Sequence, residues 1–393
     1  MNHIHICLVS EQTIPNIMGI CHFNPDELLF VSTEKMESRR TVEHILSALA
    51  YLGRNFKNRF KTIVVKEDSL LDCKKKLDEW ISGKESDEFI VNLTGGTKIM
   101  SIAAYEYFKD YGSRMGYIPI GRNEFITIFP KKTSNAVDHI SLRLSVPAYL
   151  SAYGLKVTNT NNLLSSHEQA LSRKEISKWI MQNYDAVKNL LNEFSLKLRK
   201  FRGDRSERPF SYIPQTEKEK ELLTKMGFLK DKDTYTKNLN RSKIIYLTGG
   251  WLEEFCYNEL LQFKGKGIDD IVLGISPEKQ GLKNEFDIMF TKDNALYTVE
   301  CKSLNQDNDP KAEALYKIAA LQKEFGLRVE SFYVSTSPHI LKDGELKHSI
   351  KARAEQFKTT VILPQEVINI AKIVAEKLRI NLPEANNDRT NNN

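Results

Sequence analysis

Three charged residues in the carboxyl-terminal third of the chain have the types and the spacing of a metal-dependent phosphodiesterase site. Asp287 lies in one strand-like run, Glu285–Phe290, and Glu300 follows a second run, Ala295–Val299, after a polar Lys-Asp-Asn turn. Strand side chains repeat every two residues, so Glu300 and Lys302 can point into one pocket. Two carboxylates beside an ammonium group suit Mg²⁺ or Mn²⁺ and a phosphate.

A predicted helix upstream supplies another candidate carboxylate. It follows the pair Gly249-Gly250, and its first turn holds Glu253 and Glu254, about 100° apart, so that one of them faces the sheet. We favour Glu253 for the site and expect Glu254 in solvent. The reason is the apolar stripe beside Glu253, which consists of Leu252, Cys256 and Leu260.

Chance is the alternative explanation of this pattern. The same Glu-x-Lys spacing recurs at Glu345 and Lys347, in what reads as a polar loop. Glu285, two residues before Asp287, can also face the site and is a further candidate.

The motif Asp287…Glu300-Cys301-Lys302 resembles the PD-(D/E)xK nuclease superfamily, and with the upstream helix the resemblance covers roughly residues 244–380. The resemblance implies that Asp287, Glu300 and Glu253 hold one or two divalent ions, Mn²⁺ or Mg²⁺. It implies that Lys302 orients the attacking water or stabilises the developing charge, and that Cys301 points away into packing.

A glycine-rich turn near residue 95 has the composition of a phosphate site. The segment Asn92-Leu93-Thr94-Gly95-Gly96-Thr97-Lys98 follows a strand-like run and opens a helix. Its glycines let backbone amides approach an anion, the helix start adds a positive dipole end, and hydroxyls and a cation complete the set. It matches neither the Walker A loop nor the G-x-G-x-x-G fingerprint. A capped helix start without a ligand is the alternative.

This turn, together with the polar turn after the first strand, resembles the CRISPR-associated Rossmann-fold (CARF) sensor domains over about residues 1–150. The resemblance implies a homodimer that binds cyclic oligoadenylate, expected to be cyclic tetra-adenylate, across its two-fold axis. The ligand contacts that it implies are Ser10, Glu11, Gln12, Thr13, Asn16, Thr94, Gly95, Gly96, Thr97 and Lys98.

The first 130 residues alternate strand-like and helical segments, which predicts an α/β fold with a Rossmann-like parallel sheet. The expected strands are His5–Ser10, Leu28–Ser32, Thr62–Val65, Phe89–Leu93 and Met115–Ile120. The expected helices are Thr41–Leu52, Ser69–Ser82 and Thr97–Tyr111. In such a sheet, ligands bind beyond the carboxyl ends of the strands, where both polar turns lie.

The middle of the chain is predicted to be a linker followed by a basic helical segment. Thr158–Ser166 is rich in Asn, Ser and Thr and reads as a linker, Arg173–Phe201 as a helix, and Glu217–Leu229 as part of a winged-helix-like module. Between Arg173 and Lys243 there are 18 basic and 10 acidic residues, an excess that favours a nucleic-acid partner or a solvated helix face.

The carboxyl-terminal part is predicted to be a restriction-endonuclease-like α/β domain joined to the first by the helical segment. We expect a helix over Trp251–Phe263 and strands at Ile268–Ile275 and Ser331–Ser335, flanking the hairpin already described. Two further helices are expected over Pro310–Phe325 and Gln365–Leu378. The predicted domains are therefore 1–150, 151–243 and 244–382, with a disordered tail at 383–393.

Composition fits an ordinary soluble protein. The 393 residues carry a net charge of +6, and no apolar run reaches the roughly 20 residues that span a bilayer, so no membrane partner and a cytoplasmic location are expected. The five cysteines lie far apart, which favours reduced and mostly buried thiols. His3 and His5 have ligand-like spacing, but a structural role on a terminal strand is the preferred interpretation.

The two resemblances together imply a metal-dependent endonuclease that cleaves single-stranded DNA, RNA or both, or nicks duplex DNA, under control of cyclic tetra-adenylate in type III CRISPR defence. A non-catalytic regulator with the same sensor is the main alternative, and a nucleotide-binding oligomerisation domain on a restriction or repair nuclease is another. The choice of DNA or RNA, Mn²⁺ or Mg²⁺, the ring size, and any cleavage of the ring by the sensor stay open at this stage.

Overall fold

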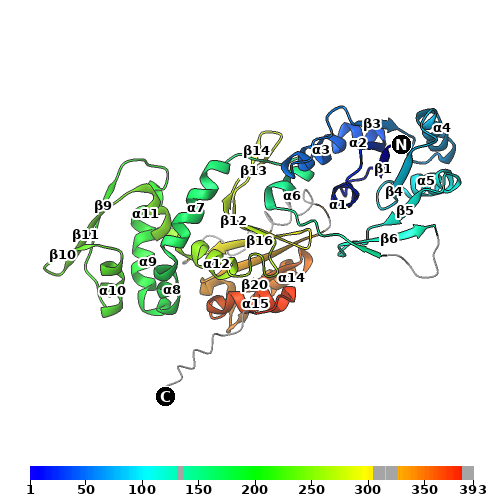
Figure 1. Cartoon of the computed structure of the whole chain (residues 1–393). Coiled ribbons are helices and arrows are strands. Elements are labelled where there is room, and N and C mark those ends of the chain that lie inside the picture. Colours follow the sequence, from blue (N-terminus) through cyan, green and yellow to red (C-terminus); the bar gives the residue numbers. More distant parts are fainter. Residues whose placement is uncertain (131–136, 304–314, 316–325, 327, 383–393) are drawn as a thin grey trace, which may run out of the picture.

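The computed structural model describes residues 1–130, 137–303, 315, 326 and 328–382. The chain forms an elongated molecule with the amino-terminal domain at one end, a second α/β domain in the middle and a helical segment at the other end (Figure 1). Apart from Leu315, the helix expected over Pro310–Phe325 lies outside the described residues, and so does the tail from 383.

The amino-terminal domain is built on a sheet whose described strands run in the order β3-β2-β1-β4-β5-β6-β7. Strands β1 to β5 are parallel, as predicted, because helices return the chain between them. The strands are β1 (His3–Leu8), β2 (Glu27–Ser32), β3 (Phe60–Val64), β4 (Glu88–Asn92), β5 (Arg114–Tyr117), β6 (Glu124–Phe129) and β7 (Val137–His139). The antiparallel pair β6 and β7 was not predicted.

Helices cover both faces of this sheet. They are α1 (Ile14–Phe23), α2 (Glu34–Ser38), α3 (Thr41–Tyr51), α4 (Leu70–Ile81) and α5 (Lys98–Asp110). Helix α1 was missed because its run is apolar on every side and contains Pro15, which the helix tolerates in its first turn.

The middle of the chain corrects two expectations. The segment expected to be a linker, Thr158–Ser166, lies mostly in α7 (Thr160–Ser172), and the single helix expected over Arg173–Phe201 breaks at Asn183. The elements are α6 (Val146–Ala152), β8 (Lys156–Val157), α7, α8 (Lys174–Gln182), α9 (Tyr184–Leu198), η1 (Arg199–Phe201), β9 (Arg208–Tyr212), α10 (Glu217–Lys225), β10 (Leu229–Asp231), β11 (Thr234–Leu239) and α11 (Arg241–Ile245). Strands β9, β10 and β11 pair antiparallel beside α10.

The third part is a mixed sheet in the order β12-β15-β16-β17-β20, in which β12, β15 and β16 are antiparallel and β16, β17 and β20 are parallel. Its strands are β12 (Asp270–Ile275), β15 (Phe286–Lys292), β16 (Ala295–Lys302), β17 (Val329–Ser335) and β20 (Thr359–Ile362). Beside it, β13 (Pro277–Lys279) pairs antiparallel with both β14 (Leu282–Lys283) and β8, and β18 (Leu341–Lys342) pairs with β19 (Glu345–Leu346).

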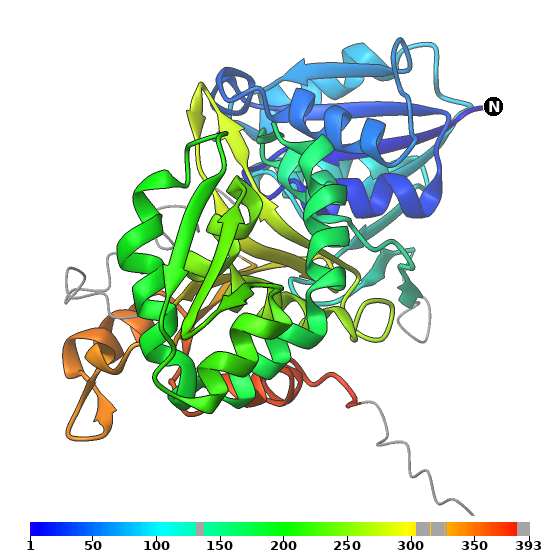
Figure 2. The same cartoon turned by 90° about the vertical axis from the view of Figure 1, so that its left-hand side faces the viewer.

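The helical elements of this part surround the sheet. They are η2 (Tyr246–Gly250), α12 (Trp251–Leu261), η3 (Pro338–Ile340), α14 (His348–Gln356), η4 (Val367–Asn369) and α15 (Ile370–Leu378). In the view turned by 90°, the helices of the middle segment stand in front of the sheet (Figure 2).

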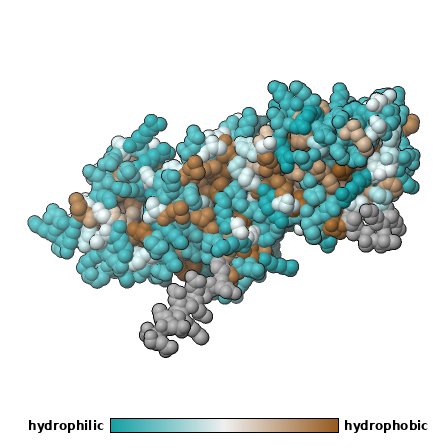
Figure 3. Space-filling model, viewed as in Figure 1, coloured by the Kyte–Doolittle hydropathy of each residue, from teal (hydrophilic) through white to brown (hydrophobic). Residues whose placement is uncertain are grey.

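Two hydrophobic clusters join the parts into one body. One continues from the amino-terminal domain through Tyr149 of α6 to Phe286, Met289 and Leu296 in the hairpin. The other joins α9 and α12 to the opposite face of the same hairpin. Hydrophobic residues are visible along the middle of the molecule, while both ends are chiefly hydrophilic (Figure 3). No helix among the described residues has the length and apolarity to cross a bilayer.

Candidate nuclease site and sensor turns

The hairpin β15-β16 brings Asp287 and Glu300 to one face of the sheet. Its tight turn uses Asp293 and Asn294, both with positive φ, which these residues tolerate. Ile288 lies opposite Val299, so the preceding Asp287 and the following Glu300 are neighbours across the strands. Residues opposite each other in an antiparallel pair share a face.

The charged groups of the hairpin are held by short hydrogen bonds. Lys302 donates from Nζ to Glu300 Oε1 at 2.7 Å, and the backbone N–H of Cys301 donates to Asp287 Oδ2 at 2.7 Å. Glu300 is 4% exposed. The Cys301 side chain packs into the core beside Cys256, as the resemblance implied.

Helix α12 points Glu253 at this group from the other side. The turn before the helix is kinked at Gly249, whose φ of 142° is open to glycine. A Cβ at Gly249 would lie 2.8 Å from Ser303 Oγ and 3.1 Å from Arg202 Nη2, so the missing side chain lets the helix start approach the end of β16. Arg202 donates from Nε to Thr248 Oγ1 at 2.6 Å.

The electrostatics show that these side chains form one cluster. Burial raises the pKa of Glu253 to about 7; Arg202 and Lys302 oppose that rise and Glu300 and Glu285 add to it. Burial, with the charges of Glu253 and Glu300, raises the pKa of Asp287 well above its usual value.

The two cations of the cluster shift in opposite directions. Burial would lower the pKa of Lys302, but Glu300 and Asp287 outweigh it and the pKa rises, so the ammonium stays charged. Burial lowers the pKa of Arg202 although Glu253 and Asp287 oppose it.

Glu254 does not lie in solvent, as we expected from the sequence. It is 7% exposed and forms a bidentate pair with Arg173, whose Nε donates to Oε2 at 2.8 Å. The expectation was wrong because α7 and α8 cover this side of α12, which periodicity within α12 does not reveal.

The donor set of the cluster suits a hard divalent cation. Glu300 is buried, Glu253 and Asp287 are half-buried, and the charge of Glu300 raises the pKa of the other two, so a bound positive charge would relieve the repulsion. Among the described residues, no three His, Cys, Asp or Glu side chains are arranged to hold a metal ion as they stand. Asp287 directs one oxygen to the Cys301 amide and Glu300 one to Lys302, so small side-chain rotations have to complete the shell.

A polar cleft of about 450 Å³ opens beside the cluster. Glu285 connects the two, since it lines the cleft and its charge acts on Glu253. Arg241 and Lys283 also line the cleft, and Arg241 donates to the carbonyl of Arg202 at 2.9 Å. Sequence reasoning missed Arg202, Arg241 and Lys283, although the basic excess of the middle segment was a signal for the first two.

Two polar turns, Ser10–Thr13 and Asn92–Lys98, lie side by side at the carboxyl ends of β1 and β4, and we call them the sensor turns. These parallel neighbours, with Cys7 opposite Asn92, form the point at which the strand order reverses. Gly95 sits against the carbonyl oxygen of Leu8, where a Cβ would lie 2.0 Å away. Thr97 caps α5, because its Oγ1 accepts from the Met100 amide at 3.2 Å.

The residues of the second turn differ in how far they are already engaged within the domain. Thr94 Oγ1 donates to Asn92 Oδ1 at 2.6 Å and accepts from the Ile118 amide at 2.8 Å, so it is engaged within the domain. Gly96 has a φ of 70°, and Lys98 is exposed at the start of α5.

Some residues of the first turn are buried and form hydrogen bonds within the protein. Thr13 and Asn16 are buried: Thr13 donates to the carbonyl of Ala152 at 2.7 Å, and Asn16 donates to that of Leu8 at 3.0 Å. Glu11 pairs with Lys35 and Arg39 of α2 and its end, cations that sequence reasoning did not connect to this turn. Ser10 Oγ accepts from the Gln12 amide at 3.3 Å.

Fold and geometry together define a ligand-binding α/β domain joined to a nuclease-like domain, and family comparisons agree. Residues 4–149 match the family model of the Card1 CARF domain, and residues 240–381 match that of the Card1-like endonuclease domain. The chain therefore belongs to the Card1-like proteins, which carry a CARF domain and an endonuclease domain. A comparison with curated proteins found no match.

Solved structures share this fold over nearly the whole chain. The structure of Can2 from Sulfobacillus thermosulfidooxidans with cyclic tetra-adenylate is 20% identical, with a TM-score of 0.75, 96% of this chain covered and 99% of that one. Protein VC1899 from Vibrio cholerae is 16% identical, with a TM-score of 0.78 and coverages of 96% and 98%. A type III CRISPR defence DNA nuclease activated by cyclic oligoadenylate is 17% identical, with a TM-score of 0.53 and coverages of 90% and 51%.

Proposed function

We propose that the protein is a metal-dependent endonuclease that cleaves single-stranded DNA, RNA or both, or nicks duplex DNA, when its CARF domain binds cyclic tetra-adenylate. The observation that carries the proposal is the cluster of Glu253, Asp287, Glu300 and Lys302 at the end of one hairpin. The setting is type III CRISPR antiviral defence, in which a neighbour of the same fold acts.

Each residue of the cluster has a role that its position supports. Glu253, Asp287 and Glu300 would hold Mn²⁺ or Mg²⁺, which supplies a nucleophilic water and neutralises phosphate charge. Lys302, charged and 2.7 Å from Glu300, would orient the water or stabilise charge on the phosphate. Arg202 lies close enough to stabilise the same charge, and Arg241 and Lys283 would receive the flanking phosphates.

The contacts between the domains give the ligand a route to the cluster. Thr13, behind the first sensor turn, bonds to Ala152 in α6. Helix α6 packs on β12 and β15, the strand that carries Asp287. A ring bound across a homodimer axis would activate the nuclease if it favours the arrangement in which the shell is complete.

The test is a panel of single-stranded DNA, single-stranded RNA and supercoiled DNA, with Mn²⁺ or Mg²⁺ and with or without cyclic tetra-adenylate. We expect cleavage that needs both the metal and the ring. Binding of the ring without cleavage of any substrate would favour the non-catalytic regulator. Metal-dependent cleavage at equal rates with and without the ring would leave a nuclease but refute the activation.

A further inference from the structure

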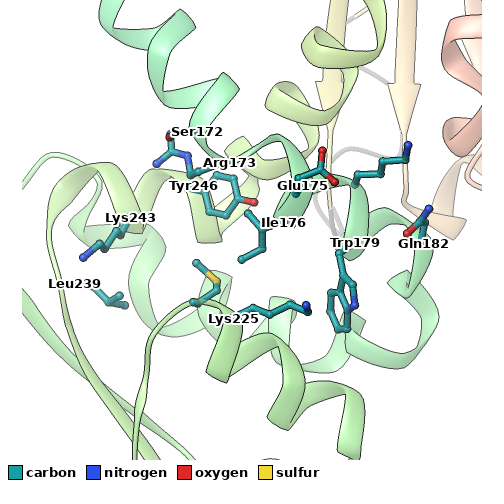
Figure 4. A pocket seen from close by; sticks show the side chains of 12 residues that line it. Ser172, Arg173, Glu175, Ile176, Trp179, Gln182, Lys225, Leu239, Lys243 and Tyr246 are labelled. Atoms are coloured by element: carbon teal, nitrogen blue, oxygen red, sulfur yellow. The ribbon is translucent and has the colours of Figure 1, made fainter.

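A second pocket, of about 680 Å³, lies in the basic middle segment, away from the residues of the cluster and the sensor turns. Its walls come from the end of α7, α8, the end of α10, β11, α11 and the start of η2. The side chains in Figure 4 show Ile176 between Trp179 on one side and Tyr246 and Lys243 on the other, with Lys225 below.

The lining combines an apolar floor with a cationic rim. Ile176, Trp179, Met226, Leu239 and Tyr246 provide apolar and aromatic surface. The charged lining residues are Arg173, Lys178, Lys225 and Lys243 against the single acid Glu175. A flat apolar group that carries negative charge fits this combination, and a nucleotide is such a group.

The cations near Trp179 are available to an anion. Lys218 and Lys225 lie 5.4 and 5.8 Å from the centre of the indole ring, and both pair with Glu221, at 3.0 and 3.6 Å. All three side chains are at least 40% exposed, and such pairs contribute little, so a phosphate can replace the carboxylate at small cost. On the opposite wall Lys243 lies near another cation, Lys237, which adds to the positive potential there.

The pocket is connected to the polar cleft by two helices. Helix α11 places Arg241 in the cleft and Lys243 in the pocket. Helix α7 places Asn162 in the cleft and its last residue, Ser172, in the pocket, and these ten steps span about 15 Å. At roughly 3.4 Å per stacked nucleotide, about four to five nucleotides bridge the distance.

We propose that this pocket binds a nucleotide of single-stranded DNA or RNA, with its base on Trp179 and its phosphates on Lys178, Lys225 and Lys243, about four to five nucleotides from the part of the strand that lies in the polar cleft. The assignment of the second contact to the cleaved strand rests on the proposed nuclease function; the binding itself does not. The pocket would hold unpaired strands selectively, because a base that is paired inside a duplex cannot reach the indole ring of Trp179.

Binding is measured by fluorescence anisotropy with the full chain, a labelled oligo(dT) of about 20 nucleotides and EDTA, so that no cleavage takes place. We expect Trp179→Ala to weaken binding about five- to a hundredfold, and Trp179→Phe to stay within about threefold of the wild type. Lys178→Ala and Lys243→Ala should each weaken binding and reduce its salt dependence. Lys188→Ala, on α9 outside the pocket, removes the same charge and should leave the affinity unchanged.

Equal affinities of wild type and Trp179→Ala, with the same melting temperature, would overturn the proposal, and so would equal binding of a duplex of the same length. A loss in Trp179→Phe as large as that in Trp179→Ala would also overturn it, because stacking survives that change. If the variants bind as expected but the wild type cleaves nothing, the nuclease proposal fails and the pocket stands. If the wild type cleaves and Trp179→Ala binds normally, the pocket proposal fails and the nuclease proposal stands.

Discussion

The carboxylates of the cluster lower the stability of the folded protein in the absence of a metal ion. Glu253, Asp287 and Glu300 are brought together at a partly buried place, where burial and the charge of Glu300 raise the pKa of Glu253 and of Asp287. Such an arrangement weakens the folded state until a cation binds. The cost and the proposed activity therefore have the same physical origin.

Asp287→Asn and Glu300→Gln should each lower the cleavage rate at least about a hundredfold. A neutral amide is a poor metal ligand, and each substitution removes a negative charge that binds the cation. Without metal, Asp287→Asn should melt no lower than the wild type, since it removes a repelling charge, whereas Glu300→Gln should melt lower, because it breaks the pair with Lys302. Mn²⁺ should raise the melting temperature of the wild type but not of the variants. Glu259→Gln on α12, outside the cluster, is the control and should cleave normally; retained cleavage in both site variants would rule out the site.

His5 makes the stability of the amino-terminal domain depend on pH. It is 0% exposed, its ring nitrogens have no hydrogen-bond partner among the described residues, and burial, followed by the charge of His22, lowers its pKa to about 3. Between pH 6.5 and 3 the unfolded chain therefore binds a proton that the folded chain refuses, and stability falls by about 1.4 kcal/mol per pH unit.

We therefore expect the free energy of unfolding to drop between pH 7 and 5 by about 2 kcal/mol less in His5→Leu than in the wild type. Urea unfolding at the two pH values measures this difference. An identical drop in both proteins would show that His5 does not titrate in this range.

Helices and strands show where sequence reasoning succeeds and where it stops. Periodicity predicted β1 to β5 and the hairpin β15-β16, because each buries a regular face. It missed β20, a strand of four residues, and misread α7, whose Asn- and Ser-rich start is held as a helix by tertiary contacts such as that of Asn159 with Gly274. The motif Asp287…Glu300-Cys301-Lys302 predicted which residues share a face, but contributions from distant elements such as Arg202 follow from packing alone.

The junction of α7 and α8 with α12 should depend on the pair of Arg173 and Glu254. Arg173→Met leaves a buried carboxylate without its partner and should cost about 2 to 4 kcal/mol of stability. The double variant Arg173→Met/Glu254→Leu should recover most of this loss, because no unpaired charge remains. Chemical denaturation measures both; a single variant as stable as the wild type would show that the pair does not lock the elements.

At the scale of the whole molecule, one of the contacts that connect the sensor domain to the hairpin is a joint at Asn294. Asn294, 1% exposed in the hairpin turn, donates to Asn123 Oδ1 at 2.9 Å and to the carbonyl of Leu142 at 3.0 Å, and accepts from the Leu144 amide at 3.0 Å. These bonds tie the strand carrying Asp287 to the end of the amino-terminal domain. The domain boundaries predicted from sequence remain a prediction, because this joint makes the parts one packed body.

Asn294→Gly keeps the left-handed turn, since glycine accepts positive φ, but removes all three bonds. We expect the ring to bind with unchanged affinity while the ratio of cleavage rates with and without it falls several-fold. Calorimetry measures the first and a time course the second. Asn238→Gly, exposed in β11, is the matched control; an unchanged ratio in Asn294→Gly would exclude this joint as the route.

The measurement that tests the account most directly is the rate of single-strand cleavage with Mn²⁺ at rising concentrations of cyclic tetra-adenylate, for the wild type and for Asp287→Asn. The account predicts a rate that rises with the ring and saturates in the wild type, and no cleavage at any concentration in Asp287→Asn, although the variant binds the ring equally well. Cleavage by Asp287→Asn at the wild-type rate would contradict the account. A wild-type rate that does not change with the concentration of cyclic tetra-adenylate would contradict it too.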